Sequence, residues 1–116
     1  MSSESPKYLF AAWAPDYTDP DALRRRFAVR AQHLEGLKAL FENGTLVHGG
    51  AMVDSDSLSP SVTAKKIEGS MGIFKASRAE EVRKIMESDI YWIANVWDKE
   101  KLEVKPLMTL PELIEM

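Results

Sequence analysis

Two histidines are the side chains in this chain best suited to moving a proton near neutral pH. His33 lies in the stretch RAQHLEGL and His48 lies in TLVHGGAMV. An imidazole titrates close to physiological pH, so it can serve as a general acid or as a general base. Arg30 comes one helical turn before His33, where its guanidinium could bind a substrate carboxylate or phenolate. These residue types indicate a small acid–base site.

Each of these residues also has a simpler interpretation. His33 falls at the boundary between the apolar stripe and the polar face of its helix, where one structural hydrogen bond would account for it. Arg30 could be a solvated surface arginine, and His48 could pack against a sheet. The basic run 24–26 is typical of a solvated helix face rather than an anion site. Gly36 either leaves space beside the His33 ring for a ligand or chain segment, or permits a close helix contact.

Composition and charge exclude several classes of protein. The chain has 116 residues, 45% of them apolar, a net charge of −3 and no cysteine. The charge gives no reason to expect nucleic acid, and thiol nucleophiles, disulfides and thiolate metal sites are excluded. No apolar run approaches the roughly 20 residues of a membrane span. We expect one cytoplasmic domain over 1–116 without a cofactor, with a loose N-terminus at 1–6 and a C-terminal tail at 109–116.

Hydrophobic patterning predicts the elements that would position these side chains. Apolar residues at three- to four-residue steps predict a helix over 21–43, and Ser77 with Glu80 indicates a capping box that begins a second helix. The stripe of the first helix consists of Leu23, Phe27, Leu34, Leu37 and Phe41. The predicted strands are 7–14, 45–53, 65–76 and 101–107. This order, βαββαβ, is that of a ferredoxin-like α+β domain.

A four-stranded antiparallel sheet with both helices on one face leaves its second face to be explained. Successive strand side chains point to opposite faces, so apolar residues cannot all face the helices. The residues concerned include Leu9, Ile73, Phe74 and Val104. We expect a homodimer that buries two sheets face to face, or a ligand in that space. In the second strand, Gly49-Gly50 indicates a bulge or a close backbone approach.

Five stretches together resemble a known family. They are FAVRAQHLEGLKAL (27–40), GTLVHGGA (44–51), GSMGIF (69–74), SDIYWIANVW (88–97) and EVKPLM (103–108). In order and spacing they resemble the YciI-like (YCII-related) proteins, from Tyr8 to Met108. The resemblance implies a dimeric α/β barrel and a histidine–aspartate dyad, whose positions are matched by His33 and Asp89. The family usually has Asp-Pro-(Tyr/Phe) where this chain has Asp-Ile-Tyr.

The resemblance also implies a reaction class. His33 would act as general acid or base, oriented by Asp89, on a small cyclic or aromatic oxygenated metabolite. Isomerisation, elimination, cyclisation or hydrolysis would fit, and one branch resembling this family eliminates halide from a chlorinated hydroxyquinol. Secondary metabolism is one candidate setting. The residues expected to contact the substrate are Arg30, His48, Trp13, Tyr91, Trp92 and Trp97.

Other functions fit the same sequence. A dimeric binding module could hold a small ligand without a His–carboxylate pair, and the aromatic residues would serve equally well as dimer core. His33, His48 and Asp89 could form a facial iron triad, although no H-x-H or H-x-x-x-H spacing supports a metal. A haem- or oxygen-handling monooxygenase could use the same barrel fold.

Overall fold

The structure is a computed structural model that describes residues 5–116. The predicted loose N-terminus, 1–6, lies outside the described residues over 1–4, and residues 5–7 have no regular secondary structure. The strands are β1 (Tyr8–Pro15), β2 (Leu46–Val53), β3 (Ile67–Ala76) and β4 (Glu103–Leu107). They form one antiparallel sheet in the order β2-β3-β1-β4. This order and the alternation with helices confirm the predicted ferredoxin-like α+β fold.

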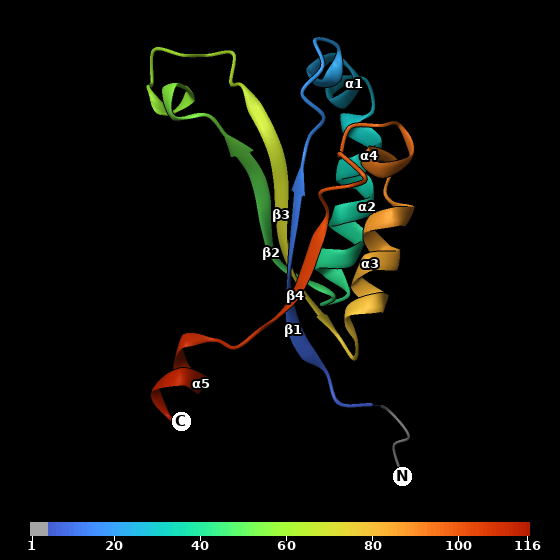
Figure 1. Ribbon diagram of the computed structural model, residues 1–116, viewed down its shortest axis with the longest axis vertical. Helices are drawn as coiled ribbons and strands as arrows, with labels where there is room; N and C mark the ends of the chain where they lie inside the picture. The colour runs from blue at the N-terminus through green and yellow to red at the C-terminus, as the bar shows by residue number, and fades with distance from the viewer. Residues whose placement is uncertain (1–4) are drawn as a thin grey trace.

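The helices form a layer on one face of the sheet. They are α1 (Ala22–Ala28), α2 (Arg30–Glu42), α3 (Ala79–Ser88) and α4 (Ile90–Ile93), with η1 (Ser55–Leu58) and α5 (Leu110–Ile114) elsewhere. Figure 1 shows α1 to α4 together beside the sheet, while β2 and β3 run upward as a pair and curve away from them toward the η1 connection. In the same view, α5 lies apart at the lower left. Among residues 5–116, no helix has the length and apolarity needed to cross a bilayer.

The predicted single helix over 21–43 is wrong, because it is two helices joined at Val29. The backbone of Val29 has φ −115° and ψ 12°, which ends α1 and begins α2. The break lets each helix direct one polar side chain inward, Arg26 from α1 and His33 from α2. The periodicity showed helical spacing but not this change of direction.

Of two other local predictions, the capping box is wrong, and of the two alternatives at Gly49-Gly50 the close backbone approach holds at Gly49. The helix after β3, α3, begins at Ala79 with Arg78 as its N-cap residue, rather than with a Ser77–Glu80 capping box, and no side chain caps it. Glu80 and Glu81 instead place negative charge in the first turn, where the helix dipole favours it. The register of β2 shifts on either side of Gly49-Gly50 rather than at it. A Cβ on Gly49 would lie 3.1 Å from the Met71 carbonyl oxygen, so this glycine serves a close approach.

Alternation along the strands divides the sheet into a buried and an open face. Phe10 and Phe74 pair across β1 and β3 and are buried under the helices. Ala11 and Ile73 pair one position along, so they point to the opposite face. Trp13 lies on that face and is 50% exposed. The expectation that apolar strand residues face both ways is confirmed.

Candidate active site

His33 and Asp89 come together although His33 lies on α2 and Asp89 lies between α3 and α4. His33 Nδ1 is 2.7 Å from Asp89 Oδ1 and 2.9 Å from Oδ2, and the side chains are 7% and 11% exposed. A carboxylate can only accept, so Nδ1 carries the proton and donates it. Nε2 is then the ring nitrogen left for other chemistry, on a residue that lines a cavity.

Asp89 is positioned by its place between two helices. Its backbone N–H bonds to Met86 O at the end of α3. Its side chain caps α4, because Oδ1 also accepts from the Tyr91 N–H at 2.8 Å. One carboxylate therefore orients the imidazole and satisfies a helix N-terminus. Ile90, where the family has proline, is the first residue of α4.

Aromatic rings hold the imidazole on two sides. The Tyr91 ring stacks on His33 with centroids 3.6 Å apart and an interplanar angle of 11°. Trp97 meets His33 and Tyr91 edge-on, with centroids 5.8 and 5.7 Å away. The backbone N–H of Trp97 bonds to Tyr91 O at 3.1 Å. The ring of His33 is thus fixed by a carboxylate at one nitrogen and by packing across its face.

Arg26 is buried beside this pair, which corrects the prediction that run 24–26 is a solvated face. Its Nε donates to Asp16 Oδ2 at 3.0 Å, and its Nη2 donates to Gly69 O at 3.0 Å and to Ser70 Oγ at 2.6 Å. The guanidinium lies 4.7 Å from the centre of the Tyr91 ring. Trp97 Nε1 donates to the same Ser70 Oγ at 3.1 Å. The run therefore contains one buried member, because α1 faces the core at this position.

Asp16 carries the strongest electrostatic perturbation in this cluster. Burial raises the pKa of its carboxyl to about 6, and the positive charges of Arg26 and His33 oppose that rise. Its Oδ1 is buried and, within residues 5–116, has no hydrogen-bond partner. Burial likewise lowers the pKa of Arg26, and Asp16 opposes it. The sequence position of Asp16, directly after the first strand, could have indicated a site residue. Nothing in the sequence distinguishes Ser70.

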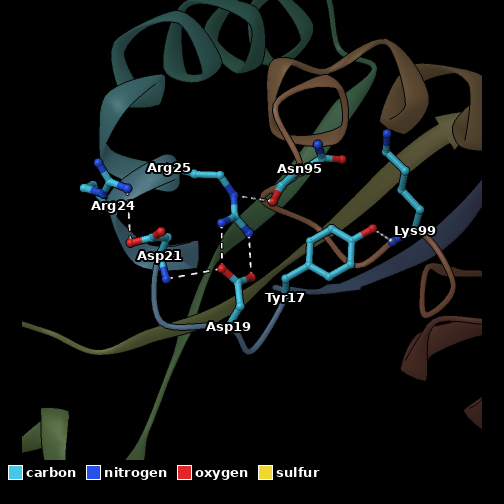
Figure 2. Close-up of polar contacts among 7 residues, drawn as sticks. All are labelled: Tyr17, Asp19, Asp21, Arg24, Arg25, Asn95 and Lys99. Atoms are coloured by element: carbon cyan, nitrogen blue, oxygen red, sulfur yellow. Dashed lines mark hydrogen bonds and ion pairs between the residues drawn. The ribbon is translucent and has the colours of Figure 1, made fainter.

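A second network holds the segment that carries Trp97 against α1 (Figure 2). Arg25 donates from both terminal nitrogens to Asp19, each at 2.7 Å, and from Nε to Asn95 O at 3.0 Å. The Lys99 N–H donates to the Tyr17 hydroxyl at 3.4 Å. The hydrogen bonds from Arg25 lower the pKa of Asp19 to about 2. Asn95 adopts φ 60°, a left-handed conformation that asparagine tolerates well.

A cavity of about 580 Å³ lies beside His33, between α2 and the β2–β3 pair. Its apolar wall includes Phe27, Leu34 and Phe41, which are 51%, 42% and 57% exposed. These residues were predicted as the core-facing stripe of the helix, and they instead face the cavity. The strand opposite offers only small side chains there, from Gly49 to Ala51. The space under α2 is consequently left open.

The predicted substrate-contacting residues divide into two groups. Arg30, His48, Tyr91 and Trp97 line the cavity with His33. Trp13 lies on the open face of the sheet, and Trp92 packs near Lys99, whose Nζ is 5.6 Å from its ring centre. The cavity also includes Arg26 and Ser70, which the sequence did not suggest.

Two further expectations are answered by the geometry. A Cβ on Gly36 would meet no atom within 4 Å, and Gly36 does not line the cavity, so its predicted role beside the imidazole is not supported. In the part of the chain that the structure describes, no three His, Cys, Asp or Glu side chains group as metal ligands. His48 thus does not join His33 and Asp89 in a facial triad.

Fold and site define a ferredoxin-like domain with a buried His–Asp pair in the wall of an apolar cavity. Residues 9–107 match the YCII-related domain, and the chain belongs to the YCII-related family. This confirms the family that the sequence resembles.

Curated proteins that are similar in sequence come from Gibberella and Fusarium species, and two of them are named for fusaric acid biosynthesis. Fusaric acid biosynthesis protein 2 of Gibberella fujikuroi is 30% identical over 106 residues, which cover 91% of this chain and 96% of that protein. The protein of the same name from Gibberella moniliformis gives the same values. Aspartate kinase FUB3 of Fusarium oxysporum is 31% identical over 106 residues, 91% of this chain. The chain spans only 18% of the length of that kinase.

A solved structure shares the fold. It is 5-chloro-2-hydroxyhydroquinone dehydrochlorinase from Burkholderia phenoliruptrix, in complex with 2,5-dihydroxybenzoquinone. The superposition has a TM-score of 0.70 and covers 86% of this chain and 93% of the dehydrochlorinase, at 23% identity. At that identity the likeness establishes the ferredoxin-like fold.

Proposed function

We propose that this protein is an enzyme that transfers protons on a small cyclic or aromatic oxygenated metabolite. The observation that carries this proposal is the His33–Asp89 pair, held at 2.7 Å in the wall of the cavity. Asp89 keeps the proton on Nδ1, so Nε2 can take a proton from a bound ligand. The imidazolium formed in that step is stabilised by the same carboxylate.

The shape and lining of the cavity support a planar, largely apolar ligand. Its apolar wall residues favour a ring, while polar residues of the lining, among them His33, Arg30 and His48, can orient one. The dehydrochlorinase complex with 2,5-dihydroxybenzoquinone supports a quinone-like ligand by analogy. The fusaric acid relatives support a place in secondary metabolism.

The alternative is a module that binds a small molecule without chemistry. Such a module would need an apolar cavity, which this chain has, but no imidazole oriented by a buried carboxylate. The cost of burying both polar groups at the cavity wall favours the enzyme. The reactions compatible with one acid–base histidine are isomerisation, elimination, cyclisation and hydrolysis.

Hydrogen–deuterium exchange tests proton transfer without knowledge of the natural substrate. The protein would be incubated in D₂O with small cyclic ketones, lactones and hydroxyquinones, including 2,5-dihydroxybenzoquinone, and exchange at carbon followed by NMR. We expect catalysed exchange on at least one compound, and a loss of about 10²–10⁴-fold in His33→Gln. Glu35→Gln, a conservative change at an exposed position of α2, is the control and should exchange like wild type. Equal exchange in His33→Gln, or none above buffer in wild type, would refute the proposal.

A further inference from the structure

The cavity contains a hydrogen-bond donor that the His33–Asp89 pair does not use. Ser70 lies on β3, lines the cavity and is 8% exposed. Its Oγ accepts from Arg26 Nη2 at 2.6 Å and from Trp97 Nε1 at 3.1 Å. Guanidinium and indole nitrogens can only donate, so both lone pairs of the hydroxyl are occupied. The hydroxyl hydrogen is then left to donate to a third group, such as a bound ligand.

No such third group exists within residues 5–116, because Ser70 Oγ makes only these two hydrogen bonds there. Arg26 leaves further donors at the same place. Its Nε and Nη2 are bonded to Asp16, Gly69 and Ser70, whereas its Nη1 hydrogens meet no acceptor in the same range. Nη1 is bonded to the same guanidinium carbon as Nη2, which lies 2.6 Å from Ser70 Oγ, so the unused donors belong to two contacting side chains that both line the cavity.

We propose that Ser70 and Arg26 form a subsite for an oxyanion on the ligand, an enolate- or phenolate-type oxygen attached to a planar ring. This inference rests on the proposed function and adds the substrate feature that the cavity selects. Asp16 balances the charge of Arg26, so the oxygen is held mainly by oriented donors. Arg30, which lines the cavity and forms no ion pair with the described residues, supplies a further positive charge.

Trp97 connects this subsite to the acid–base pair. Its ring lies nearly perpendicular to that of His33, with centroids 5.8 Å apart, and its Nε1 bonds to Ser70. A ring whose oxygen binds at Ser70 would lie beside the imidazole. When Nε2 takes a proton from the carbon next to a C=O group of the ligand, the C–H electron pair forms a C=C bond and the C=O π pair moves onto that oxygen, which becomes the enolate oxyanion. Donors already aimed at the oxygen stabilise this charge, and return of the proton from Nε2 completes the exchange.

Equilibrium binding of two matched probes tests the subsite. One is 4-nitrophenolate, used at a pH where it is ionised, and the other is 4-nitroanisole, its neutral methyl ether. By calorimetry, we expect wild type to bind the phenolate at least about tenfold more tightly than the ether, because hydrogen bonds to a charged oxygen are the stronger kind. Ser70→Ala should lose about tenfold or more in phenolate affinity and change ether affinity less than about twofold.

Ser57→Ala is the matched control, because Ser57 is also a buried serine that bonds a main-chain N–H, that of Lys66, but lies away from the cavity. It should leave both affinities unchanged. A wild type that binds neither probe or does not prefer the phenolate, or a Ser70→Ala variant that keeps the preference, would overturn the subsite. Should Ser70→Ala fail to fold, the indole N–H resonance of Trp97 decides. It must shift with the phenolate and not with the ether.

These measurements separate the subsite from the proposed function. Binding needs no turnover, so the preference for the phenolate is measured without any reaction at His33. Ser70-dependent binding without any catalysed exchange would leave the subsite standing and remove the enzyme. Exchange that depends on His33, with binding indifferent to Ser70, would leave the enzyme standing and remove the subsite.

Discussion

The side chain of Asp89 has two roles, capping α4 and orienting the imidazole of His33. Oδ1 accepts from the Tyr91 N–H and from His33 Nδ1, which an asparagine oxygen could also do, whereas Oδ2, 2.9 Å from the same Nδ1, would be replaced by an NH₂ donor in asparagine. The substitution Asp89→Asn therefore separates helix capping from control of the imidazole.

We expect Asp89→Asn to keep α4 and to move the ring proton of His33 from Nδ1 to Nε2. The side-chain amide would donate toward Nδ1, leaving the protonated nitrogen toward the ligand, so kcat should fall about 10²–10⁴-fold. ¹⁵N NMR of the ring nitrogens reports the tautomer directly. Asp54→Asn, which changes the capping side chain of η1, is the control. An unchanged Nδ1–H resonance in Asp89→Asn would contradict the assignment.

Asp16 should leave a pH-dependent signature on stability. Its pKa rises from 3.8 to about 6 on folding, so the folded state holds this proton more tightly than the unfolded state. That contribution is complete below about pH 4 and is lost as the pH rises to about 6. The unfolding free energy of wild type relative to Asp16→Asn should fall by about 3 kcal/mol over this interval, measured by urea unfolding. An offset between the two proteins that does not vary with pH would refute it; Asp56→Asn, at an exposed site, should give none of this dependence.

Residue types predicted part of the site, and sequence distance hid the rest. His33 could be singled out because it is one of only two histidines and lies on an amphipathic helix. Its partner lies 56 residues away, and Asp89 was assigned only through the family resemblance. The burial of Arg26 depends on the break at Val29, which periodicity does not encode. Ser70 becomes distinctive only through the two donors that fold onto it.

Element boundaries followed from patterning more closely than element directions did. The four strands begin one or two residues later than predicted. The apolar stripe of α2 was identified, but a stripe facing the core and one facing a cavity look alike in sequence. What distinguishes them is the partner strand, where Gly49 and Gly50 present no side chain to fill the space.

The Arg25 network should control the mobility of the α4–β4 connection. Arg25→Ala removes the bonds to Asp19 and to the Asn95 carbonyl, so amide exchange should become faster in residues 94–99 and remain unchanged in β1 and β3. Because the pKa of Asp19 is lowered to about 2 in the folded protein, the contribution of this carboxylate to folding stability is present above about pH 4 and is lost as the pH falls through about 2. Arg24→Ala, which disturbs only an exposed pair with Asp21, is the control. Unchanged amide exchange at residues 94–99 in Arg25→Ala would show that these hydrogen bonds do not restrain the α4–β4 connection.

At the scale of the whole molecule, no element within residues 5–116 covers one face of the sheet. Leu9, Ala11, Met71 and Ile73 occupy the strand positions that alternate with the buried ones, and Trp13 and Leu107 there are 50% and 38% exposed. Lys75, Glu103 and Lys105 pair with residues of this face and lie on it too, and exposed apolar side chains with polar neighbours indicate an interface. The homodimer expected from the sequence remains our prediction for what covers it.

Substitution on the open face tests that assembly. We expect wild type to sediment as a dimer at micromolar concentration, and Trp13→Glu to sediment as a monomer, because a carboxylate would be buried in the interface without a partner. Ile93→Glu changes an apolar residue on α4 that is even more exposed than Trp13, away from this face, and should stay dimeric. A monomeric wild type would remove the explanation for the open face.

The position of Trp97 makes its fluorescence a reporter of the site. Its indole touches His33 and bonds to Ser70, so protonation of the imidazole, which quenches indole emission, or a ligand at the hydroxyl would change its fluorescence. Trp13 and Trp92 lie outside the cavity and could be replaced by phenylalanine to leave a single emitter. Compound libraries could then be screened on unlabelled protein, with occupancy read from emission before any reaction is identified.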